Sequence, residues 1–268
     1  MKIDGSVAIV TGGAQGVGRG IVEALLGKGA KVCIADINKA TSELTVKELA
    51  ETYGDKIFCK ECDVTKDAEI RAVFGVVQDK FGSRADIMVN NAGICDEFDF
   101  ARCVAINLEA QIRCTHAAVE SMGVNNGGKG GVILFTASIL GVIPFQGAPV
   151  YCATKHAVVG YVRCLASCPS YSQCGLRFNC ICPSYVDTPL ISVAELSKNI
   201  DAECIDAAIE KRNSVDLLRP SDVGVGCIKL IEDDTLNGKA LVVNHGDTGR
   251  GDVAVYSFAE PPTDTIKL

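Results

Sequence analysis

Three residues in one short segment have the types and spacing needed for proton transfer to or from an alcohol. Ser138 begins the segment, and Tyr151 and Lys155 end it at a separation of four residues. If residues 151–155 are helical, the phenol and the ammonium lie on one face, one turn apart. A nearby cation favours the phenolate, so we expect Lys155 to lower the pKa of Tyr151 from its usual value of about 10. Such a phenol can take a proton from a secondary alcohol or return one to a ketone.

The same spacing of tyrosine and lysine also arises by chance in helices, so the neighbouring segments decide its meaning. Ser138 ends the apolar run GGVILFTAS, which predicts a strand that stops at this residue. A hydroxyl at the end of a strand would be exposed at the edge of the sheet. It could then hydrogen-bond the substrate oxygen that exchanges its proton with Tyr151.

The chain opens with a pattern for binding a dinucleotide. Residues 6–11, SVAIVT, are typical of a strand buried on both faces, and IVEALLGKG has a helical pattern. Between them lie Gly12, Gly16 and Gly18 in the spacing T-G-x-x-x-G-x-G. Gly12 permits the tight turn, Gly16 lets the backbone approach the pyrophosphate, and Gly18 allows close packing. The phosphates would lie near the positive end of the helix.

Asp36 ends the second predicted strand, KVCIADI, at the distance from the glycine loop where a ribose ligand is expected. A carboxylate there accepts hydrogen bonds from both adenosine ribose hydroxyls and repels a 2′-phosphate. The alternative is a solvated carboxylate at a strand end. Arg19 and Lys39 are the nearest basic residues, and Arg19 could equally be a surface residue of the helix. The sequence therefore favours NAD over NADP.

Other polar residues could border the same cofactor. Asp63 and Val64, at the end of the predicted strand IFCKECDV, could flank the adenine by a hydrogen bond and by packing. The residues N-N-A-G at 90–93 could form a polar elbow beside the glycine loop, although a plain turn explains them equally well. Asn107, in the largely apolar segment CVAINLEA, is either a satisfied core amide or a hydrogen-bonding link near the site.

Strand and helix patterns alternate through nearly the whole chain. This alternation predicts an α/β fold: a single-domain, Rossmann-type doubly wound parallel sheet of about seven strands with helices on both faces. No linker or repeat divides residues 1–268. Residues about 186–215 read as looser, charged helices and are expected to form a mobile lid over the substrate. Residues about 247–268 read as a polar tail.

Composition and charge exclude several classes of function. A formal net charge of −7 and a pI near 5.1 argue against binding nucleic acid through a basic face. No stretch is both long and apolar enough to cross a bilayer, and the first residues lack the pattern of a signal peptide. We therefore expect a cytoplasmic protein.

Fourteen cysteines raise the question of disulfides or a metal site. Most of them, such as Cys33 and Cys180, lie inside apolar runs, where cysteine acts as a small hydrophobic residue. Cys59 and Cys62 form one C-x-x-C, but no second pair follows at a zinc-finger spacing. The three histidines offer no helical pair of ligands. We predict free structural thiols and no bound metal.

Taken together and in order, these motifs resemble those of the classical short-chain dehydrogenases/reductases over nearly the whole chain. The resemblance rests on T-G-G-A-Q-G-V-G at 11–18, N-N-A-G at 90–93, Asn107, Ser138 and Y-x-x-x-K at 151–155. It implies that Tyr151 is the acid/base, that Ser138 orients and polarises the substrate oxygen, and that Lys155 also binds the nicotinamide ribose. Asn107 would hold a water that links Lys155 to solvent. The expected cofactor-binding residues are Gly12, Gln15, Gly16, Val17, Gly18, Asp36, Asp63, Val64, Asn91, Ala92, Gly93, Tyr151, Lys155, Pro183, Val186 and Thr188.

Within that family the chain most resembles the subgroup of NAD-dependent 15-hydroxyprostaglandin dehydrogenases, in stretches such as PVYCATKHAVVGYVR and LIEDDTLNGKALVV. Two positions depart from the subgroup. Ala148 stands where a substrate-facing glutamine is expected, with Gln146 two residues earlier, and Ser184 follows Pro183 where the family has glycine. A lost amide would change how a polar group of the substrate is recognised.

We therefore predict NAD-dependent interconversion of a secondary alcohol and a ketone on a lipophilic substrate. A prostanoid or other oxylipin, a terpenoid alcohol or a steroid would fit, and reduction is the same chemistry reversed. A non-catalytic nucleotide-binding regulatory protein is the alternative from another class. The expected substrate-contacting residues are Ser138, Leu140, Phe145, Gln146, Ala148, Tyr185 and Leu190, with Ile139 and Ile143 in the apolar lining.

The family usually pairs through helices that correspond to residues about 102–122 and 152–168. The resemblance thus implies a homodimer or homotetramer. The apolar run Ala157–Leu165 fits such pairing, but burial inside a monomer would produce the same pattern.

Overall fold

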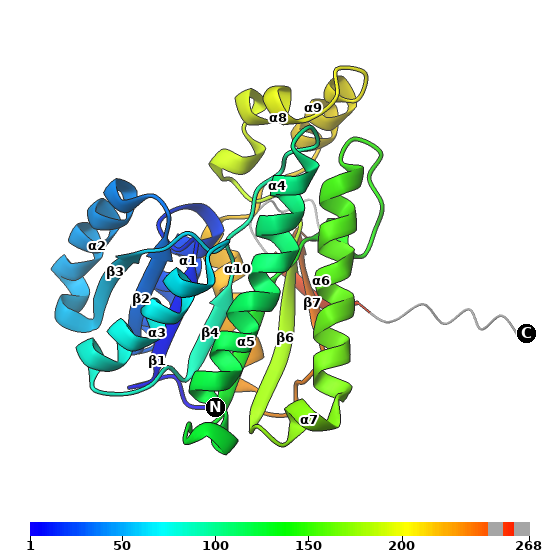
Figure 1. Cartoon of the computed structure of the whole chain (residues 1–268). Coiled ribbons are helices and arrows are strands. Elements are labelled where there is room, and N and C mark those ends of the chain that lie inside the picture. Colours follow the sequence, from blue (N-terminus) through cyan, green and yellow to red (C-terminus); the bar gives the residue numbers. More distant parts are fainter. Residues whose placement is uncertain (246–253, 260–268) are drawn as a thin grey trace, which may run out of the picture.

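The computed structural model describes residues 1–245 and 254–259, and these form one α/β domain around a single sheet. The strands of the described residues run in the order β3-β2-β1-β4-β5-β6-β7-β8, and β1 to β7 are parallel. Figure 1 shows the sheet with its helices. The strands are β1 (Val7–Thr11), β2 (Lys31–Asp36), β3 (Ile57–Glu61), β4 (Ile87–Asn90), β5 (Gly131–Thr136), β6 (Leu176–Pro183), β7 (Ala240–His245) and β8 (Ala254–Phe258).

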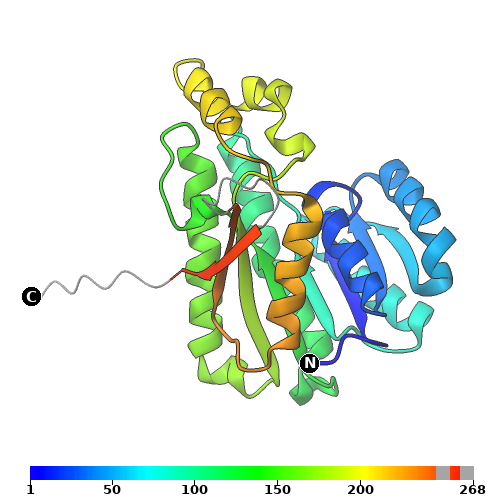
Figure 2. The same ribbon diagram turned by 180° about the vertical axis from the view of Figure 1, so that it is seen from behind.

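Helices cover both faces of this sheet, as the alternating pattern predicted. Helices α3, α5 and α6 pack on one face of the sheet, and α1, α2 and α10 pack on the other. Figure 2 shows the molecule from the side opposite to that of Figure 1. The helices are α1 (Gly16–Gly27), α2 (Lys39–Tyr53), α3 (Asp67–Phe81), α4 (Phe100–Val104), α5 (Ala110–Met122), α6 (Pro149–Ser167), α7 (Pro169–Ser172), α8 (Val193–Asn199), α9 (Ile205–Asn213) and α10 (Pro220–Glu232).

The central strands are apolar throughout because each of their faces meets a layer of helices. In β1, Val7 and Ile9 point into the core under α3, α5 and α6, whereas Ala8 and Val10 point into the core under α1 and α10. Successive side chains of a strand alternate between faces, so a doubly covered strand has no solvent-facing position. This is why the run SVAIVT predicted a buried strand correctly.

The strand order reverses between β1 and β4, and this reversal positions the site. From β1 the chain builds the sheet outward through β2 and β3, then returns to β4 on the other side of β1. The crossover connections therefore leave β1 and β4 in opposite directions and open a crevice at the carboxyl ends of the strands. Helices α8 and α9 stand over this end of the sheet (Figure 1).

One prediction about the sheet was incomplete. About seven parallel strands were expected, with residues about 247–268 as a polar tail. The structure instead places an eighth strand, Ala254–Phe258, inside that segment, antiparallel to β7. The run AVYSF is rich in residues that favour strands, and β7 would otherwise be the open edge of the sheet. The remainder of the predicted tail lies outside the described residues.

The segment predicted as one helix over residues about 102–122 is interrupted. Helix α4 leads into a π-helical turn, Ala105–Glu109, before α5 begins. Asn107 lies in the middle of this turn and is fully buried. In a π-turn the backbone hydrogen bonds join residues five apart instead of four. Such a turn inside an α-helix often marks a functional position.

Candidate active site

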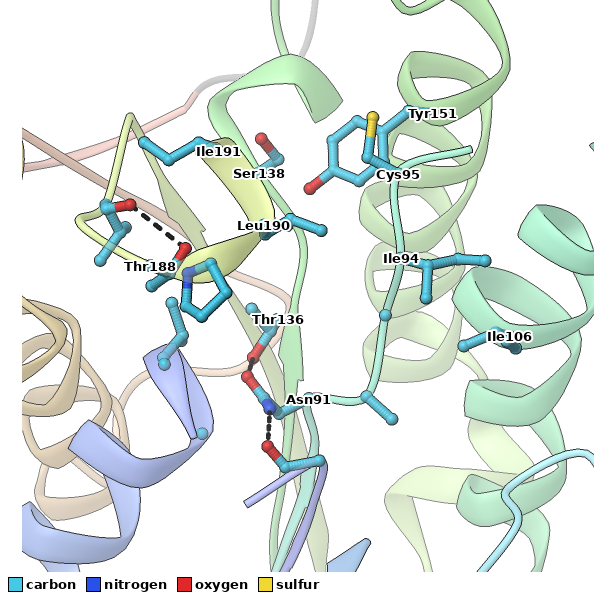
Figure 3. A pocket seen from close by; sticks show the side chains of 18 of the residues that line it. Asn91, Ile94, Cys95, Ile106, Thr136, Ser138, Tyr151, Thr188, Leu190 and Ile191 are labelled. Atoms are coloured by element: carbon cyan, nitrogen blue, oxygen red, sulfur yellow. Dashed lines mark hydrogen bonds between the residues drawn. The ribbon is translucent and has the colours of Figure 1, made fainter. Parts of the chain in front are cut away.

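A cavity of about 640 Å³ lies where the parallel strands end. Its walls come from the segments that directly follow β1 to β6, and residues of α8 and α9 close it from the opposite side. Figure 3 shows side chains that line it. It brings together most of the predicted site residues: Gly12, Gln15, Gly16, Val17, Gly18, Asp36, Asp63, Val64, Asn91, Ala92, Gly93, Ser138, Leu140, Phe145, Ala148, Tyr151, Lys155, Pro183, Tyr185, Val186, Thr188 and Leu190.

The glycine loop has the backbone shape that a dinucleotide-binding turn requires. Gly12 and Gly16 have φ angles of +61° and +55°, a conformation that residues with a Cβ rarely adopt. Gln15 begins α1 without a side-chain cap from any described residue. The first backbone N–H groups of α1 are therefore left for an anionic group at the positive end of the helix.

The carboxylate of Asp36 closes the other side of this loop. One of its oxygens accepts a hydrogen bond from the Ala14 amide at 3.1 Å, and the other accepts one from the Asn38 amide at 2.9 Å. Both oxygens keep further lone pairs for two hydroxyl groups. The basic residues that might have received a 2′-phosphate pair with carboxylates: Arg19 with Glu23 and Glu48, at 2.8 and 2.9 Å, and Lys39 with Glu43, at 4.0 Å. This arrangement fits NAD.

The amide of Asn91 braces the turns on either side of the crevice. Its Nδ2 donates to the carbonyl oxygens of Thr11 and Gly12, at 3.0 Å each, and its Oδ1 accepts from the Thr136 hydroxyl at 3.1 Å (Figure 3). One side chain thus fixes the ends of β1, β4 and β5 relative to one another. The N-N-A-G segment is therefore more than a plain turn.

Asp63 lies at the far end of the cavity, beside the half of the crevice that would receive adenine. Its Oδ1 accepts hydrogen bonds from the backbone and the hydroxyl of Thr65, at 3.0 and 2.7 Å. These bonds hold the pKa of Asp63 below its usual range. The neighbouring Val64 is buried and apolar, so the pair offers one acceptor and one packing surface to the cavity.

The hydroxyl of Tyr151 points toward Ser138 in the wider part of the cavity (Figure 3). Ser138 lies directly beyond the end of β5, and its Oγ accepts a hydrogen bond from the Leu140 amide at 3.1 Å. Lys155 lies one turn beyond Tyr151 on α6, with its Nζ 5.4 Å from the centre of the phenol ring. The same Nζ donates to the carbonyl oxygen of Thr136 at 2.8 Å. Local helix geometry and the end of β5 thus bring together the three residues that the sequence singled out.

The expectation that Lys155 lowers the pKa of Tyr151 is not met in this structure. Burial raises the pKa of Tyr151 above its ordinary value, and the contact with Ser138 lowers it only in part. The ammonium lies against the face of the ring and binds the Thr136 carbonyl rather than the phenol oxygen. The i, i+4 spacing placed the two side chains on one face, but it did not determine which atoms meet.

Burial has the opposite effect on Lys155 and lowers its pKa to about 8. A lysine of the unfolded chain titrates near pH 10.4, so at pH values between these two the unfolded state binds more protons than the folded state. The free energy of unfolding therefore rises with pH across this window. Below about pH 8 the buried amine is protonated, so the folded state carries the full free-energy cost of burying the ammonium.

Replacing Lys155 by methionine should consequently stabilise the protein near neutral pH. The pKa shift corresponds to about 3 kcal/mol, and loss of the hydrogen bond to Thr136 offsets about 1 kcal/mol of it. We expect the free energy of unfolding of Lys155→Met to exceed that of the wild type by about 2 kcal/mol at about pH 7. This difference should shrink as the pH approaches about 10. Urea unfolding at several pH values measures this. The matched control is Lys47→Met on the exposed face of α2, and a pH-independent difference for Lys155→Met would contradict the assignment.

Asn107 does not line the cavity. Its side-chain amide is buried and fully hydrogen-bonded. Its Oδ1 accepts from the Ile94 amide, and its Nδ2 donates to the Ile94 carbonyl oxygen, both at 2.8 Å. The Nδ2 also lies 3.2 Å from the hydroxyl of Thr154 on α6. Of the two interpretations of this residue, a satisfied buried amide describes its side chain. It fixes the segment that follows β4 against α6.

Gln146 was predicted to contact the substrate, but the structure does not place it in the cavity lining. Its side chain is exposed and is absent from the cavity lining, and Ile143 is likewise 49% exposed. Residues 142–147 form a loop that lies outside the cavity except at Phe145, whereas Ala148 returns to it and is buried. The amide at position 146 therefore does not replace the one absent at position 148.

Sequence reasoning missed one wall of the cavity. Ile94, Cys95, Arg102 and Ile106 line it from the segment between β4 and α5 (Figure 3 labels three of them). For Ile94 and Cys95 the available signal was their position directly after N-N-A-G, and Arg102 and Ile106 carried no such signal. Of the lid, only Val186, Thr188 and Leu190 were predicted by residue, and it also contributes Ile191, Glu195, Leu196, Ile200 and Ala208.

The cysteines are free thiols in this structure. All fourteen cysteines are free, and burial raises the pKa of most of the buried thiols, for example that of Cys62 to about 11. Among the residues that the structure describes, no group of three or more His, Cys, Asp or Glu could hold a metal ion. Over the same residues, no helix is long and apolar enough to span a membrane.

Comparison with known proteins identifies a family model and relatives that cover most of this chain. The family model described as short chain dehydrogenase matches residues 6–199. The chain is 38% identical over 246 residues to 15-hydroxyprostaglandin dehydrogenase [NAD(+)] of Mus musculus, with 91% of each chain covered. It is 31% identical over 262 residues to momilactone A synthase of Oryza sativa subsp. japonica, covering 91% of this chain and 90% of the other.

Solved structures share the same architecture. A 3-ketoacyl-(acyl-carrier-protein) reductase from Brucella melitensis, complexed with NADH, is 28% identical and superposes with a TM-score of 0.76, covering 90% of this chain and 97% of that one. A short chain dehydrogenase/reductase from Burkholderia phymatum in complex with NAD has the same TM-score at 23% identity, covering 87% of each chain, and supports the fold alone.

Proposed function

The chain belongs to the short chain dehydrogenase family, and we propose that it oxidises a secondary alcohol on a lipophilic substrate, in the manner of the 15-hydroxyprostaglandin dehydrogenases that it resembles. It is an NAD-dependent oxidoreductase acting on CH–OH groups. The observation that carries the proposal is the convergence of the Tyr151 and Ser138 hydroxyls inside a largely apolar cavity that continues into the glycine loop. Reduction of the corresponding ketone is the same reaction in reverse.

The proposed reaction gives each polar side chain one task. Ser138 and Tyr151 hold the substrate hydroxyl between their oxygens, and Tyr151 accepts its proton. Lys155, buried against the tyrosine ring, would bind the nicotinamide ribose and keep the ring in place. When bound, NAD would supply a hydride acceptor, and its cationic nicotinamide ring would favour the phenolate form in which Tyr151 can accept the proton. Asn107 acts behind the site by fixing the wall that carries Ile94.

The lining favours a substrate with a long apolar body. Leu140, Phe145, Ile191 and Leu196 present hydrocarbon to the cavity, and Ala148 adds no polar group. Arg102 is the exception: its guanidinium has no acceptor among the residues that the structure describes, so it offers a cation to a carboxylate end of the substrate. Oxylipins combine these features, whereas terpenoid alcohols and steroids match the apolar lining alone.

Turnover of a panel of secondary alcohols tests the proposal. The panel contains prostaglandins and hydroxy fatty acids, their methyl esters, terpenols and hydroxysteroids, each followed by the absorbance of NADH with NAD and NADP in parallel. Preference for the free acids over their esters supports the role of Arg102. Turnover of terpenols or steroids alone would assign the enzyme to the alternative substrate class. Nucleotide binding without turnover of any alcohol would revive the non-catalytic alternative.

Removal of the charge on Asp36 should weaken the selectivity for NAD. Asp36→Asn keeps the size of the side chain but lets a 2′-phosphate approach without like-charge repulsion. We expect the ratio of kcat/KM for NAD to that for NADP to fall by about 10- to 100-fold, measured with one alcohol at fixed concentration. Asp55→Asn, outside the cavity, is the control, and an unchanged ratio in Asp36→Asn would remove Asp36 from the ribose site.

We propose a homodimer as the smallest assembly. The run Ala157–Leu165 no longer supports it, because Val158, Val159, Val162 and Leu165 pack into the core of the monomer. Support comes instead from two exposed aromatic side chains: Phe98, just before α4, is 62% exposed, and Phe100, the first residue of α4, is 64% exposed. Light scattering at micromolar concentration measures the mass, and a monomer there would exclude the dimer.

Residues about 186–215 are proposed as a lid within the single domain. They carry α8 and α9, whose buried residues form a small separate cluster with Phe145. Such a cluster can move as a unit without opening the main core. Limited proteolysis should cut this segment first, and protection by NAD with substrate would support closure. Equal cutting with and without ligand would contradict it.

The proposed compartment is the cytoplasm. Fourteen free cysteines are compatible with a reducing environment. Fractionation of cells that express the chain tests this, and recovery with a membrane or secreted fraction would contradict it.

A further inference from the structure

We infer that Glu97 is a positioning residue that holds the first turn of α6, and with it Tyr151, in the geometry needed for proton transfer. Glu97 lies between β4 and α4, more than fifty residues before the helix that it contacts. The inference rests on the proposed role of Tyr151 and adds a residue to it.

The carboxylate of Glu97 satisfies the start of α6 completely. Its Oε2 accepts a hydrogen bond from the Val150 amide at 2.8 Å, and its Oε1 accepts one from the Tyr151 amide at 2.9 Å. The helix begins at Pro149, which has no N–H, and the Cys152 amide already donates to the Ala148 carbonyl oxygen at 2.9 Å. Glu97 therefore takes the two backbone donors that the helix itself leaves unpaired.

Within residues 1–245 and 254–259, no other side chain accepts a hydrogen bond from the first turn of α6. The N-cap residue is Ala148, which is buried and has no side-chain acceptor. Helix starts normally use Ser, Thr, Asp or Asn at that position. Here the acceptor is supplied from another element, and its negative charge also suits the positive end of the helix.

Glu97 is itself held firmly in place. Its own amide donates to the carbonyl oxygen of Asn199 at 3.0 Å, at the last residue of the lid helix α8. Three residues earlier, both backbone groups of Ile94 are bound by Asn107. The carboxylate is therefore presented to α6 by a segment fastened at the lid on one side and at the π-turn on the other.

The contact of Glu97 with the start of α6 affects the placement of Tyr151 in the proposed reaction. One of the two donors is the amide of Tyr151 itself, whose phenol must reach the substrate oxygen beside Ser138. Lys155 follows one turn later on the same helix. A shift of about 1 Å in a reacting group can cost about 100-fold in rate. Loosening the first turn should thus lower kcat even though Glu97 does not touch the reacting atoms.

Glu97→Gln tests this inference because it keeps the shape and one acceptor but turns an NH₂ group toward one of the two amides. We expect kcat to fall about 10- to 100-fold, while the dissociation constant for NAD, measured by quenching of protein fluorescence or by calorimetry, stays within about twofold. Hydrogen exchange of the Val150 and Tyr151 amides, followed by NMR, should accelerate. Glu97→Asp, which restores both carboxylate oxygens on a shorter stem, should recover part of the lost kcat.

The control is Asp99→Ala in the same segment, because asparagine would keep the capping oxygen. Asp99 caps α4 by accepting from the Arg102 amide at 3.0 Å, so its loss also weakens a helix start, but away from α6. We expect a comparable fall in Tm with kcat within about twofold of the wild type. Unchanged kcat in Glu97→Gln would overturn the inference, as would equal losses of kcat in both variants. If the wild-type protein turns over no alcohol, the proposed function fails instead, and the amide exchange still decides whether Glu97 holds α6.

Discussion

Tyr151→Phe is expected to lower kcat by about three to four orders of magnitude while leaving the affinity for NAD within a few-fold. The variant keeps the ring that packs against Lys155 and removes only the oxygen that meets Ser138. General acid–base catalysis by a positioned group contributes about 10²- to 10⁴-fold. Steady-state turnover with a substrate from the alcohol panel, together with NAD titration, measures both quantities.

Tyr161→Phe provides a matched control for this prediction. Tyr161 lies on the same helix, α6, but packs its ring edge-on against Phe135, away from the cavity. Its loss of a hydroxyl should leave kcat within about threefold. Near-normal turnover in Tyr151→Phe would show that another group exchanges the proton and would remove the central assignment of the site.

Gly18→Ala is expected to abolish NAD binding and to destabilise the protein by several kcal/mol. A Cβ at this position would collide with the Gly12 carbonyl oxygen and would lie 2.6 Å from Nδ2 of Asn91. The Gly12 carbonyl already accepts a hydrogen bond from that same amide. Neither neighbour can withdraw without displacing the glycine loop or the brace that joins β1, β4 and β5. Overpacking against fixed backbone costs about 1–3 kcal/mol or more.

Gly75→Ala should instead raise the free energy of unfolding. Gly75 lies inside α3 on its exposed side, and a Cβ there would meet nothing within 4 Å. Alanine in an open helical position is about 1 kcal/mol more favourable than glycine, so this variant should gain stability and bind NAD normally. Urea unfolding and NAD titration of both variants are the measurements. Normal NAD binding by Gly18→Ala would show that the loop can relax and that Gly18 is not required for close packing.

Much of the cofactor half of the site could be predicted from the chain because its signals are local. A buried strand, a glycine turn and a helix follow one another within residues 6–29, and the backbone of this unit binds phosphate whatever surrounds it. Asp36 follows at the end of the next strand, which parallel pairing places beside the first. The comparisons with known proteins confirm the family, the fold and the cofactor that these segments indicated.

The substrate half was predicted less well because its walls come from loops with no periodic pattern. Gln146 and Ala148 are two residues apart, yet only Ala148 faces the cavity. Arg102 lies in α4 and Ile106 in the π-turn that follows it, and both line the cavity. No spacing rule predicts which residues of an irregular loop point inward, since that depends on what packs behind them.

The sequence by itself determined the order of strands and helices, the dinucleotide loop, and the pairing of Tyr151 with Lys155 on one helical face. Each of these depends on contacts between residues close together in the chain. Only the tertiary structure decided the protonation preferences of that pair, because burial, rather than the neighbouring charge, dominates both pKa values. It alone also brought Glu97 to the start of α6, since a hydrogen bond between residues more than fifty apart forms only when the whole sheet has placed their loops side by side.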